Sequence, residues 1–398
     1  MNEPQHNSET GRFGPMKFVQ LFLPLVLLAA VLVLFIQVNP MDSLTGNQPP
    51  VENLSFERVI LNGDGIVMHV INAGPETVTI AQVQVDKAYW SFNITPANEL
   101  PRLGRAIITI PYHWVEGEAH ELRLLTSLGA TFDHTIEVAV ATPNSDITRW
   151  FLLGLVGFFV GIVPVGIGLM WFPLLHSMKK KALDFVLALT VGLLVFLLFD
   201  TILEGVELAG EVPDVFNGLP LVFLIGFLSY MVLTLVGRRQ GVRDRSTPKG
   251  RLWIATAISV GIGLHNLGEG MAVGASIAAG EAALGSFLVI GFVLHNVTEG
   301  VGIGAPMAAD RPGIDKLITL TIVAGGPAIL GTWVGGFSYT PFLAVVFFSI
   351  GAGAILQVIV EVSRLLGAGE KESNALSWSN MTGMMTGIAV MYLTALLV

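Results

Sequence analysis

Long apolar segments dominate the second half of this chain, and they restrict its fold more than any other feature. In the hydrocarbon core of a bilayer, only helices and closed barrels satisfy every backbone hydrogen bond. About 20 apolar residues are needed for a helix to cross, and the segments after Arg149 have that length. They predict eight transmembrane helices, at residues 150–175, 182–206, 219–237, 252–277, 281–306, 316–337, 341–364 and 381–398.

The composition also indicates a membrane protein. Hydrophobic residues make up 53% of the chain and charged residues only 13%, unlike an ordinary soluble domain. The 45 glycines are typical of transmembrane helices that approach one another through small residues. Because the chain has no cysteine, zinc fingers, iron–sulfur clusters and disulfides are excluded. The formal charge of −9 argues against a nucleic-acid partner, which calls for a basic surface.

Two regions precede the eight segments. Residues 1–17 are polar, and residues 18–38 form an apolar run long enough to cross a bilayer. The end of this run has no small-residue cleavage site, so we expect an uncleaved transmembrane anchor rather than a signal peptide.

Residues 39–148 have a different pattern, in which apolar and polar residues alternate in short runs between turn-forming sequences. This pattern predicts an all-β domain, an antiparallel sandwich of about seven strands of the immunoglobulin or fibronectin kind. We favour a passive spacer as the role of this domain, over a partner-binding or metal-collecting module. The sequence does not indicate which partner the domain would bind. The predicted strands include residues 66–71, 78–85, 106–110 and 134–140, and His69, His113, His120 and His134 are expected to be surface or strand residues rather than ligands.

The fourth and fifth apolar segments share a polar motif, His-Asn-x-x-Glu-Gly, which begins at residue 265 in one and at residue 295 in the other. Ionisable groups are costly in a bilayer and mark functional sites there. Residues four apart on a helix share a face, so the His and the Glu of each motif point the same way. If the two helices face each other, they form a divalent-metal site whose ligands are His265, Asn266, Glu269, His295, Asn296 and Glu299.

The chemistry of these ligands narrows the choice of metal. Imidazoles combined with carboxylates suit Zn²⁺, Fe²⁺, Mn²⁺, Co²⁺ or Cd²⁺, and they fit Ca²⁺ or Mg²⁺ poorly. Two carboxylates balance the charge of one divalent ion, which allows the ion to lie at the depth of the bilayer. Zinc is the first choice, and ligand type does not exclude iron or manganese.

The basic residues predict the orientation of the chain. They occur in alternate connections between the apolar segments, and the remaining connections contain no Lys or Arg. The positive-inside rule places the basic connections in the cytoplasm. We therefore expect a multi-pass protein of the cell membrane, with residues 1–17 as a cytoplasmic tail and with residues 39–148 and the C-terminus outside.

Residues 149–398 resemble the ZIP (Zrt/Irt-like) family of divalent-metal transporters. The resemblance rests on eight spans with both ends outside, a basic connection between the third and fourth spans, and the two His-Asn-x-x-Glu-Gly motifs. It implies a ZIP-like eight-helix bundle that moves zinc, or iron or manganese, towards the cytoplasm as a secondary transporter. In such a transporter one helix bundle rocks against another without ATP, and the metal is the substrate rather than a cofactor.

The resemblance also implies two metal subsites. His265, Glu269, His295 and Glu299 match the first, and Asn266 and Asn296 with the shared carboxylates match the second. This chain departs from the family where Gly268 and Thr298 replace a proline before each acidic residue. It also has Gly326 before Pro327 where many members have a Glu. Without that carboxylate, we expect one tightly bound metal and a weak second ion.

Other polar groups in the spans are candidates for a transport pathway. Asp200 and Glu204 lie one turn apart near the outer end of the second span, and Glu207, which follows them, is a weaker candidate. Gln357 and Glu361 lie near the cytoplasmic end of the seventh span, where family members carry acidic residues along the exit route.

Three other functions compete with transport. A membrane-embedded metalloenzyme is disfavoured, since zincin-like proteases need His-Glu-x-x-His and the spans hold no third ligand histidine. A haem protein would not need the paired Asn and Glu. A transport-inactive metal sensor on the same scaffold is the third alternative. The sequence leaves the oligomeric state open, with a homodimer as one option.

Overall fold

The computed structural model describes residues 15–38, 51–142, 146–239, 247–279, 282–367 and 377–396. By their internal contacts, Met1–Val51 and Glu52–Val398 form two separate units. The first unit contains helix α1 (Pro15–Val38), which includes the predicted anchor and the apolar stretch Phe22–Leu34. The first 14 residues of the predicted tail lie outside the described residues.

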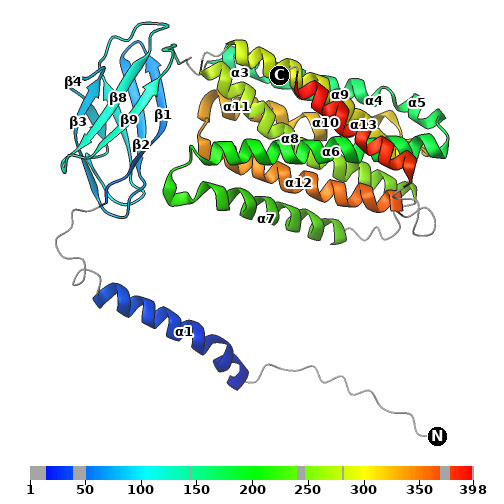
Figure 1. Ribbon diagram of the computed structural model, residues 1–398, viewed down its shortest axis with the longest axis horizontal. Coiled ribbons are helices and arrows are strands. Elements are labelled where there is room, and N and C mark those ends of the chain that lie inside the picture. Colours follow the sequence, from blue (N-terminus) through cyan, green and yellow to red (C-terminus); the bar gives the residue numbers. More distant parts are fainter. Residues whose placement is uncertain are drawn as a thin grey trace. The chain divides into compact units, whose positions relative to one another are not determined.

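A β-sandwich begins the second unit (Figure 1). Its strands pair antiparallel throughout, and the buried side chains of the two sheets form one core, which includes Ile66, Met68, Ile108, Leu122 and Leu124. One sheet has the order β1-β2-β7-β5, and the other has the order β4-β3-β8-β9 with β6 beside β3. The strands are β1 (Leu54–Asn62), β2 (Gly65–Asn72), β3 (Val78–Val85), β4 (Ala88–Trp90), β5 (Asn93–Thr95), β6 (Glu99–Leu100), β7 (Arg105–Ile110), β8 (His120–Thr126) and β9 (Thr131–Ile136).

The strand predictions were accurate for three of the four runs and wrong for the last. The described residues contain nine short strands rather than about seven. The run predicted at 134–140 belongs to β9, which begins at Thr131 and ends at Ile136. This strand ends because its partner does, since Ile136 pairs with His120, the first residue of β8.

The rest of the second unit is a bundle of long helices (Figure 1). The first predicted segment is divided into α3 (Ile147–Gly157), the π-helical turn η1 (Phe158–Ile162), α4 (Val163–Leu169) and α5 (Phe172–Ser177). The sixth is divided at Gly326 into α10 (Ile314–Gly325) and α11 (Pro327–Ser338). The others are α6 (Lys180–Ala209), α7 (Gly218–Arg239), α8 (Pro248–Ala278), α9 (Ala282–Gly304), α12 (Pro341–Gly367) and α13 (Trp378–Ala395), with short 3₁₀ turns η2 (Asp214–Phe216) and η3 (Ala305–Met307).

The helices establish a polytopic helical membrane protein, but they do not confirm the count of eight spans. Among the described residues, six helical segments are long and apolar enough to cross a bilayer. Helices α8 and α13 occupy two of the predicted positions without meeting that criterion. In α8, the polar residues His265, Asn266 and Glu269 lower the hydropathy. The six segments are Ile147–Ser177, Lys180–Ala209, Asp214–Arg238, Leu284–Met307, Ile314–Ser338 and Pro341–Leu366.

Glycines let the helices around the two motifs approach closely. A Cβ atom on Gly270, the last residue of the first motif, would overlap the carbonyl oxygen of Ala328 on α11. A Cβ atom on Gly300, the last residue of the second, would overlap the carbonyl oxygen of Val165 on α4. Each motif therefore ends in a glycine, and its lack of a side chain allows a neighbouring helix to pack directly against it.

A close contact of the same kind, at Gly331 on α11, can be tested. A Cβ atom there would overlap the carbonyl oxygen of Leu267, so Gly331→Ala should destabilise the protein by about 1–3 kcal/mol through overpacking. Gly205→Ala on α6 is the matched control, because its nearest neighbour would be 3.5 Å away. Thermal unfolding in detergent should show a lower midpoint for Gly331→Ala alone. Equal midpoints for the two variants would contradict this packing.

Candidate metal centre

Helices α8 and α9 bring the two motifs together at a buried carboxylate. Oε1 of Glu269 lies 2.9 Å from Nε2 of His265 and 2.6 Å from Nε2 of His295. Glu269 and His265 come from α8, one turn apart, whereas His295 comes from α9. One carboxylate oxygen thus holds both imidazoles, and the predicted face-to-face arrangement of the motifs is present in the structure.

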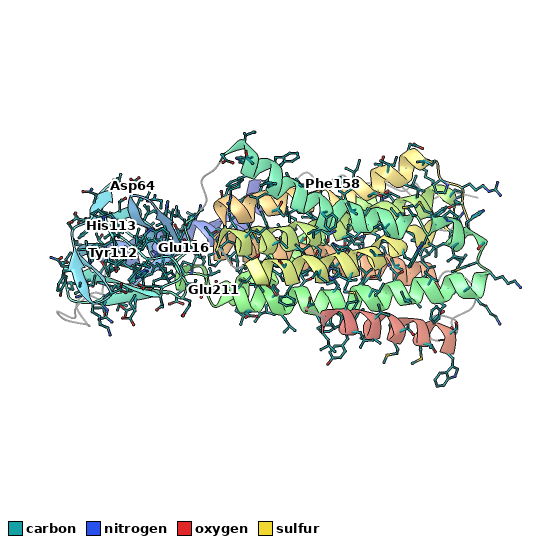
Figure 2. All side chains as sticks on the ribbon, turned by 90° about the horizontal axis from the view of Figure 1, so that it is seen from above. Asp64, Tyr112, His113, Glu116, Phe158 and Glu211 are labelled. Atoms are coloured by element: carbon teal, nitrogen blue, oxygen red, sulfur yellow. The ribbon has the colours of Figure 1, made fainter. Side chains whose placement is uncertain are left out.

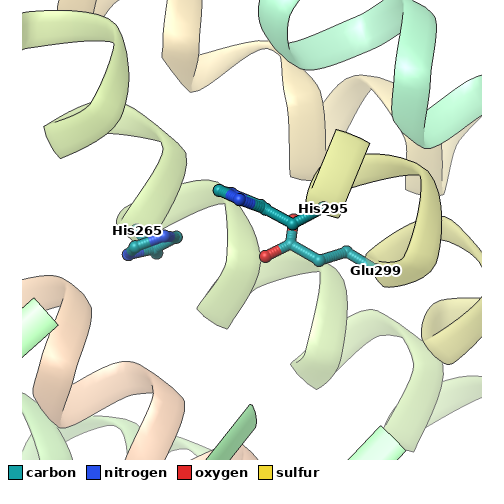
Figure 3. Close-up of side chains that lie close together, drawn as sticks. All are labelled: His265, His295 and Glu299. Atoms are coloured by element: carbon teal, nitrogen blue, oxygen red, sulfur yellow. The ribbon is translucent and has the colours of Figure 1, made fainter. Parts of the chain in front are cut away.

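Glu299 completes a group of ligand atoms around the same imidazoles. His265, His295 and Glu299 each offer one ligand atom, and the three atoms lie within 4.8 Å of one another. Figure 3 shows the His295 ring and the Glu299 carboxylate, both from α9, directed towards the side on which His265 lies. All three side chains are largely buried, with His295 the most accessible at 11%.

The hydrogen bonding of Glu299 fits a role as a cation ligand. Its side chain is 4% exposed, and neither carboxylate oxygen has a hydrogen-bond partner among the described residues. A buried carboxylate without a partner is strongly destabilising. A divalent ion bound between Glu299 and the two imidazoles would supply the missing interactions. Nitrogen and oxygen donors in this combination suit zinc and similar transition metals.

The two motif asparagines bind backbone carbonyls on neighbouring helices. Nδ2 of Asn266 donates to the carbonyl of Ala324 at 3.0 Å, and Nδ2 of Asn296 donates to the carbonyl of Val160 at 3.0 Å. Both side chains are fully buried, and their Oδ1 atoms have no partner in the part of the chain that the structure describes. The donor end of each amide is therefore fixed, and the acceptor end stays available to a cation.

Proline explains why the carbonyl of Val160 can accept a side chain. Pro164 has no N–H, so it cannot donate to the carbonyl of Val160 four residues earlier. The chain there forms the π-helical turn η1, a distortion that often accompanies functional sites. In this turn Val160 is buried and Phe158 is 43% exposed on the surface of the helical part (Figure 2). On α10, Ala324 lies just before the break at Gly326 and Pro327.

The two positions where the sequence resemblance leads us to expect proline hold other residues, Gly268 and Thr298, which make other contacts. Thr298, which stands where a proline is expected, donates its hydroxyl to the carbonyl of His295 at 2.6 Å. Gly268 lets the ring of Phe348 pack close, 3.2 Å from where a Cβ atom would lie. Pro164 and Pro327, on the facing helices, interrupt the backbone instead.

Acidic side chains line a cavity of about 720 Å³ that ends at the motif residues. Asp200 and Glu204, predicted as pathway residues, and Glu207, the weaker candidate, are exposed to this cavity from α6. Glu211, which the sequence analysis did not select, lies on its wall beyond the end of α6 (Figure 2). Its spacing from Glu207, four residues, is the signal that could have identified it. Among the described residues, neither Lys nor Arg lines this cavity.

Burial and neighbouring acids together raise the pKa values of two groups, Glu211 and Tyr339, that line the cavity. Burial, with the nearby Glu207, raises the pKa of Glu211. Burial and the charges of Glu211 and Glu204 raise the pKa of Tyr339 to about 12. The neighbouring acids that add to these shifts carry a negative charge that would attract cations.

The opposite side of the cluster is closed by packed apolar side chains. The gap next to Glu299 measures only about 10 Å³. Gln357 and Glu361, the other predicted pathway residues, are each 5% exposed on α12 and do not line the acidic cavity. Oε1 of Glu361 lies 3.3 Å from Arg364. The closing residues near Glu299 include Leu193, Leu194, Leu197 and Ile262.

Comparison with known proteins adds no assignment. No model of a known protein family matches the chain, and no curated protein matches its sequence.

Pro164→Ala tests how the backbone supports the site. The new N–H can donate to the carbonyl of Val160 and compete with Asn296, so we expect metal affinity to fall by about tenfold, as for other supporting contacts of metal ligands. Pro173→Ala is the control, because Pro173 lies in the first turn of α5, where the N–H of an alanine would have no helical partner. Calorimetric titration with Zn²⁺ measures both. Unchanged affinity in Pro164→Ala would show that Asn296 needs no freed carbonyl.

Proposed function

We propose that the protein is a secondary transporter of divalent transition-metal cations, with zinc as the first candidate and iron or manganese as alternatives. The observation that supports this most is that a cluster of metal-ligand atoms lies at the end of an acidic cavity. The ligand atoms of His265, His295 and Glu299 lie within 4.8 Å of one another, and an acidic cavity leads to two of these side chains.

Charge balance supports a divalent ion at this depth. Glu269 and Glu299 together carry two negative charges when both are ionised, and both are at most 4% exposed. An ion with a charge of +2 neutralises them, which removes the large cost of isolated charges in a low-dielectric interior. A monovalent ion would leave one charge unbalanced, and an anion would be repelled.

The two sides of the cluster differ as a carrier requires. The side that leads to Glu211 is a cavity, and the side next to Glu299 is packed with leucine and isoleucine side chains. A transporter that works by alternating access exposes its site to one side at a time. In this conformation the metal site is accessible through the acidic cavity, and the opposite conformation would open the path past Gln357 and Glu361.

The resemblance to the ZIP family supports the same function. It would make the helices from α3 to α13 an eight-span bundle, with the acidic cavity facing outward and transport directed into the cytoplasm. The substrate reaches the protein from the side of the β-sandwich under that orientation. A transport-inactive sensor would use the same metal site, and measurement of flux separates it from a carrier.

Uptake by proteoliposomes tests transport directly. Wild-type protein should give saturable uptake of radioactive Zn²⁺, and Glu269→Gln or Glu299→Gln should abolish it. Each substitution removes half of the negative charge that balances the ion in a buried site. Asp315→Asn, at an exposed position in the first turn of α10, is the control and should transport normally.

Normal flux in Glu269→Gln, with the variant correctly inserted, would contradict the assignment of the site. Tight zinc binding by wild-type protein without any flux would favour the sensor over the carrier.

Labelling of introduced cysteines tests the orientation. The chain has no native cysteine, so a single new thiol is the only reactive one. Thr247, which precedes α8, and Asn217, which precedes α7, are both exposed. An impermeant thiol reagent should label Thr247→Cys only from the cytoplasm and Asn217→Cys only from outside. If both are labelled from the same side, the proposed arrangement of α7 is incorrect.

A further inference from the structure

We infer that Thr201 on α6 is a positioning residue for the metal ligand His265, and that it fixes which ring nitrogen faces the metal. The inference rests on the proposed function, because it treats His265 as a ligand. Thr201 belongs to neither motif, and as a threonine within an apolar span it gave no signal in the sequence.

The hydrogen-bond geometry around Thr201 determines the direction of each bond. Its hydroxyl donates to the carbonyl of Leu197, one turn earlier on α6, at 2.7 Å. The same oxygen lies 3.0 Å from Nδ1 of His265. A threonine hydroxyl has one hydrogen, and the bond to Leu197 uses it. While the hydroxyl donates to Leu197, the contact with His265 is a hydrogen bond only if Nδ1 carries a proton and donates it.

A protonated Nδ1 leaves Nε2 as the nitrogen for the metal. Nε2 of His265 is the atom that lies 2.9 Å from Glu269, on the side of the carboxylates and of His295. When a metal displaces the proton from this contact, the Nε2 lone pair faces the ion while Nδ1 still donates to Thr201. Outer partners of this kind fix the tautomer and the ring orientation of metal-bound histidines.

Burial makes the alternative tautomer costly. Thr201 is 2% exposed and His265 is 3% exposed, so only a small part of either side chain is open to the acidic cavity beside them. With Nδ1 unprotonated, the Thr201 hydroxyl would have to give up its bond to the carbonyl of Leu197 and donate to the ring instead, because otherwise two acceptors would face each other at 3.0 Å. Rotating the ring would instead remove Nε2 from Glu269. Thr201 thus keeps the ring in the orientation that presents Nε2 to the ion before the ion arrives.

Three variants test this inference in the full-length protein. Thr201→Val keeps the shape and removes the hydroxyl, whereas Thr201→Ser restores it. Thr321→Val on α10 is the control, because the Thr321 hydroxyl likewise donates to the carbonyl one turn earlier, that of Leu317, at 2.9 Å. Zinc affinity is measured by competition with a chelator. The protonation of the ring nitrogens is read from ¹⁵N resonances of labelled histidines, with His265 assigned by its loss in His265→Gln.

We expect Thr201→Val to bind zinc about 10- to 100-fold more weakly, while Thr201→Ser and Thr321→Val stay close to wild type. Metal-free wild-type protein should show a protonated Nδ1 on His265, and Thr201→Val should shift this resonance. Wild-type affinity in Thr201→Val, or an unprotonated Nδ1 in the wild-type protein, would overturn the inference. If wild-type protein binds no zinc, the proposed function fails, and the ¹⁵N measurement still decides the assignment at Nδ1.

Discussion

The cost of burying a carboxylate among apolar helices is the constraint on which the rest of this structure depends. Glu269 is 2% exposed, and its oxygens contact His265, His295 and, at 3.4 Å, the side-chain amide of Asn296. Each partner is fixed in turn by another element of the bundle. Thr201 of α6 holds His265, and the carbonyl of Val160 in η1 holds Asn296. The polar network therefore links α6, α8, α9 and the distorted first segment.

Glycine and proline make that network possible in a membrane-spanning bundle. Gly270 and Gly300 allow α11 and α4 to pack against the ends of the motifs. Pro164 leaves a carbonyl without its helical donor, and the side-chain amide of Asn296 takes that place. Close packing excludes lipid from the site, and the interrupted backbone supplies the acceptors that the amides need. The asparagine oxygens and Glu299 then stay available to a cation.

Much of the membrane region could be predicted from the sequence because its signals are local. Apolar length predicted the helices of the bundle, and the four-residue spacing of His and Glu predicted the shared face that α8 and α9 present to each other. The count of eight spans remains a prediction, because polar residues reduce the hydropathy of α8. The π-helical turn and the contact between Thr201 and His265 could not be predicted. Both depend on which distant helix lies opposite, and neither leaves a periodic pattern. The end of β9 at Ile136 was missed for the same reason, since a partner strand determined it.

X-ray absorption spectroscopy of the zinc-loaded, full-length protein tests the central claim that the two motifs form one metal site. The account predicts zinc bound by two imidazoles at about 2.0–2.1 Å with oxygen ligands completing the shell. It also predicts loss of one imidazole from the spectrum of His295→Ala. A spectrum with one imidazole or none in the wild-type protein, or one that His295→Ala leaves unchanged, would contradict the account.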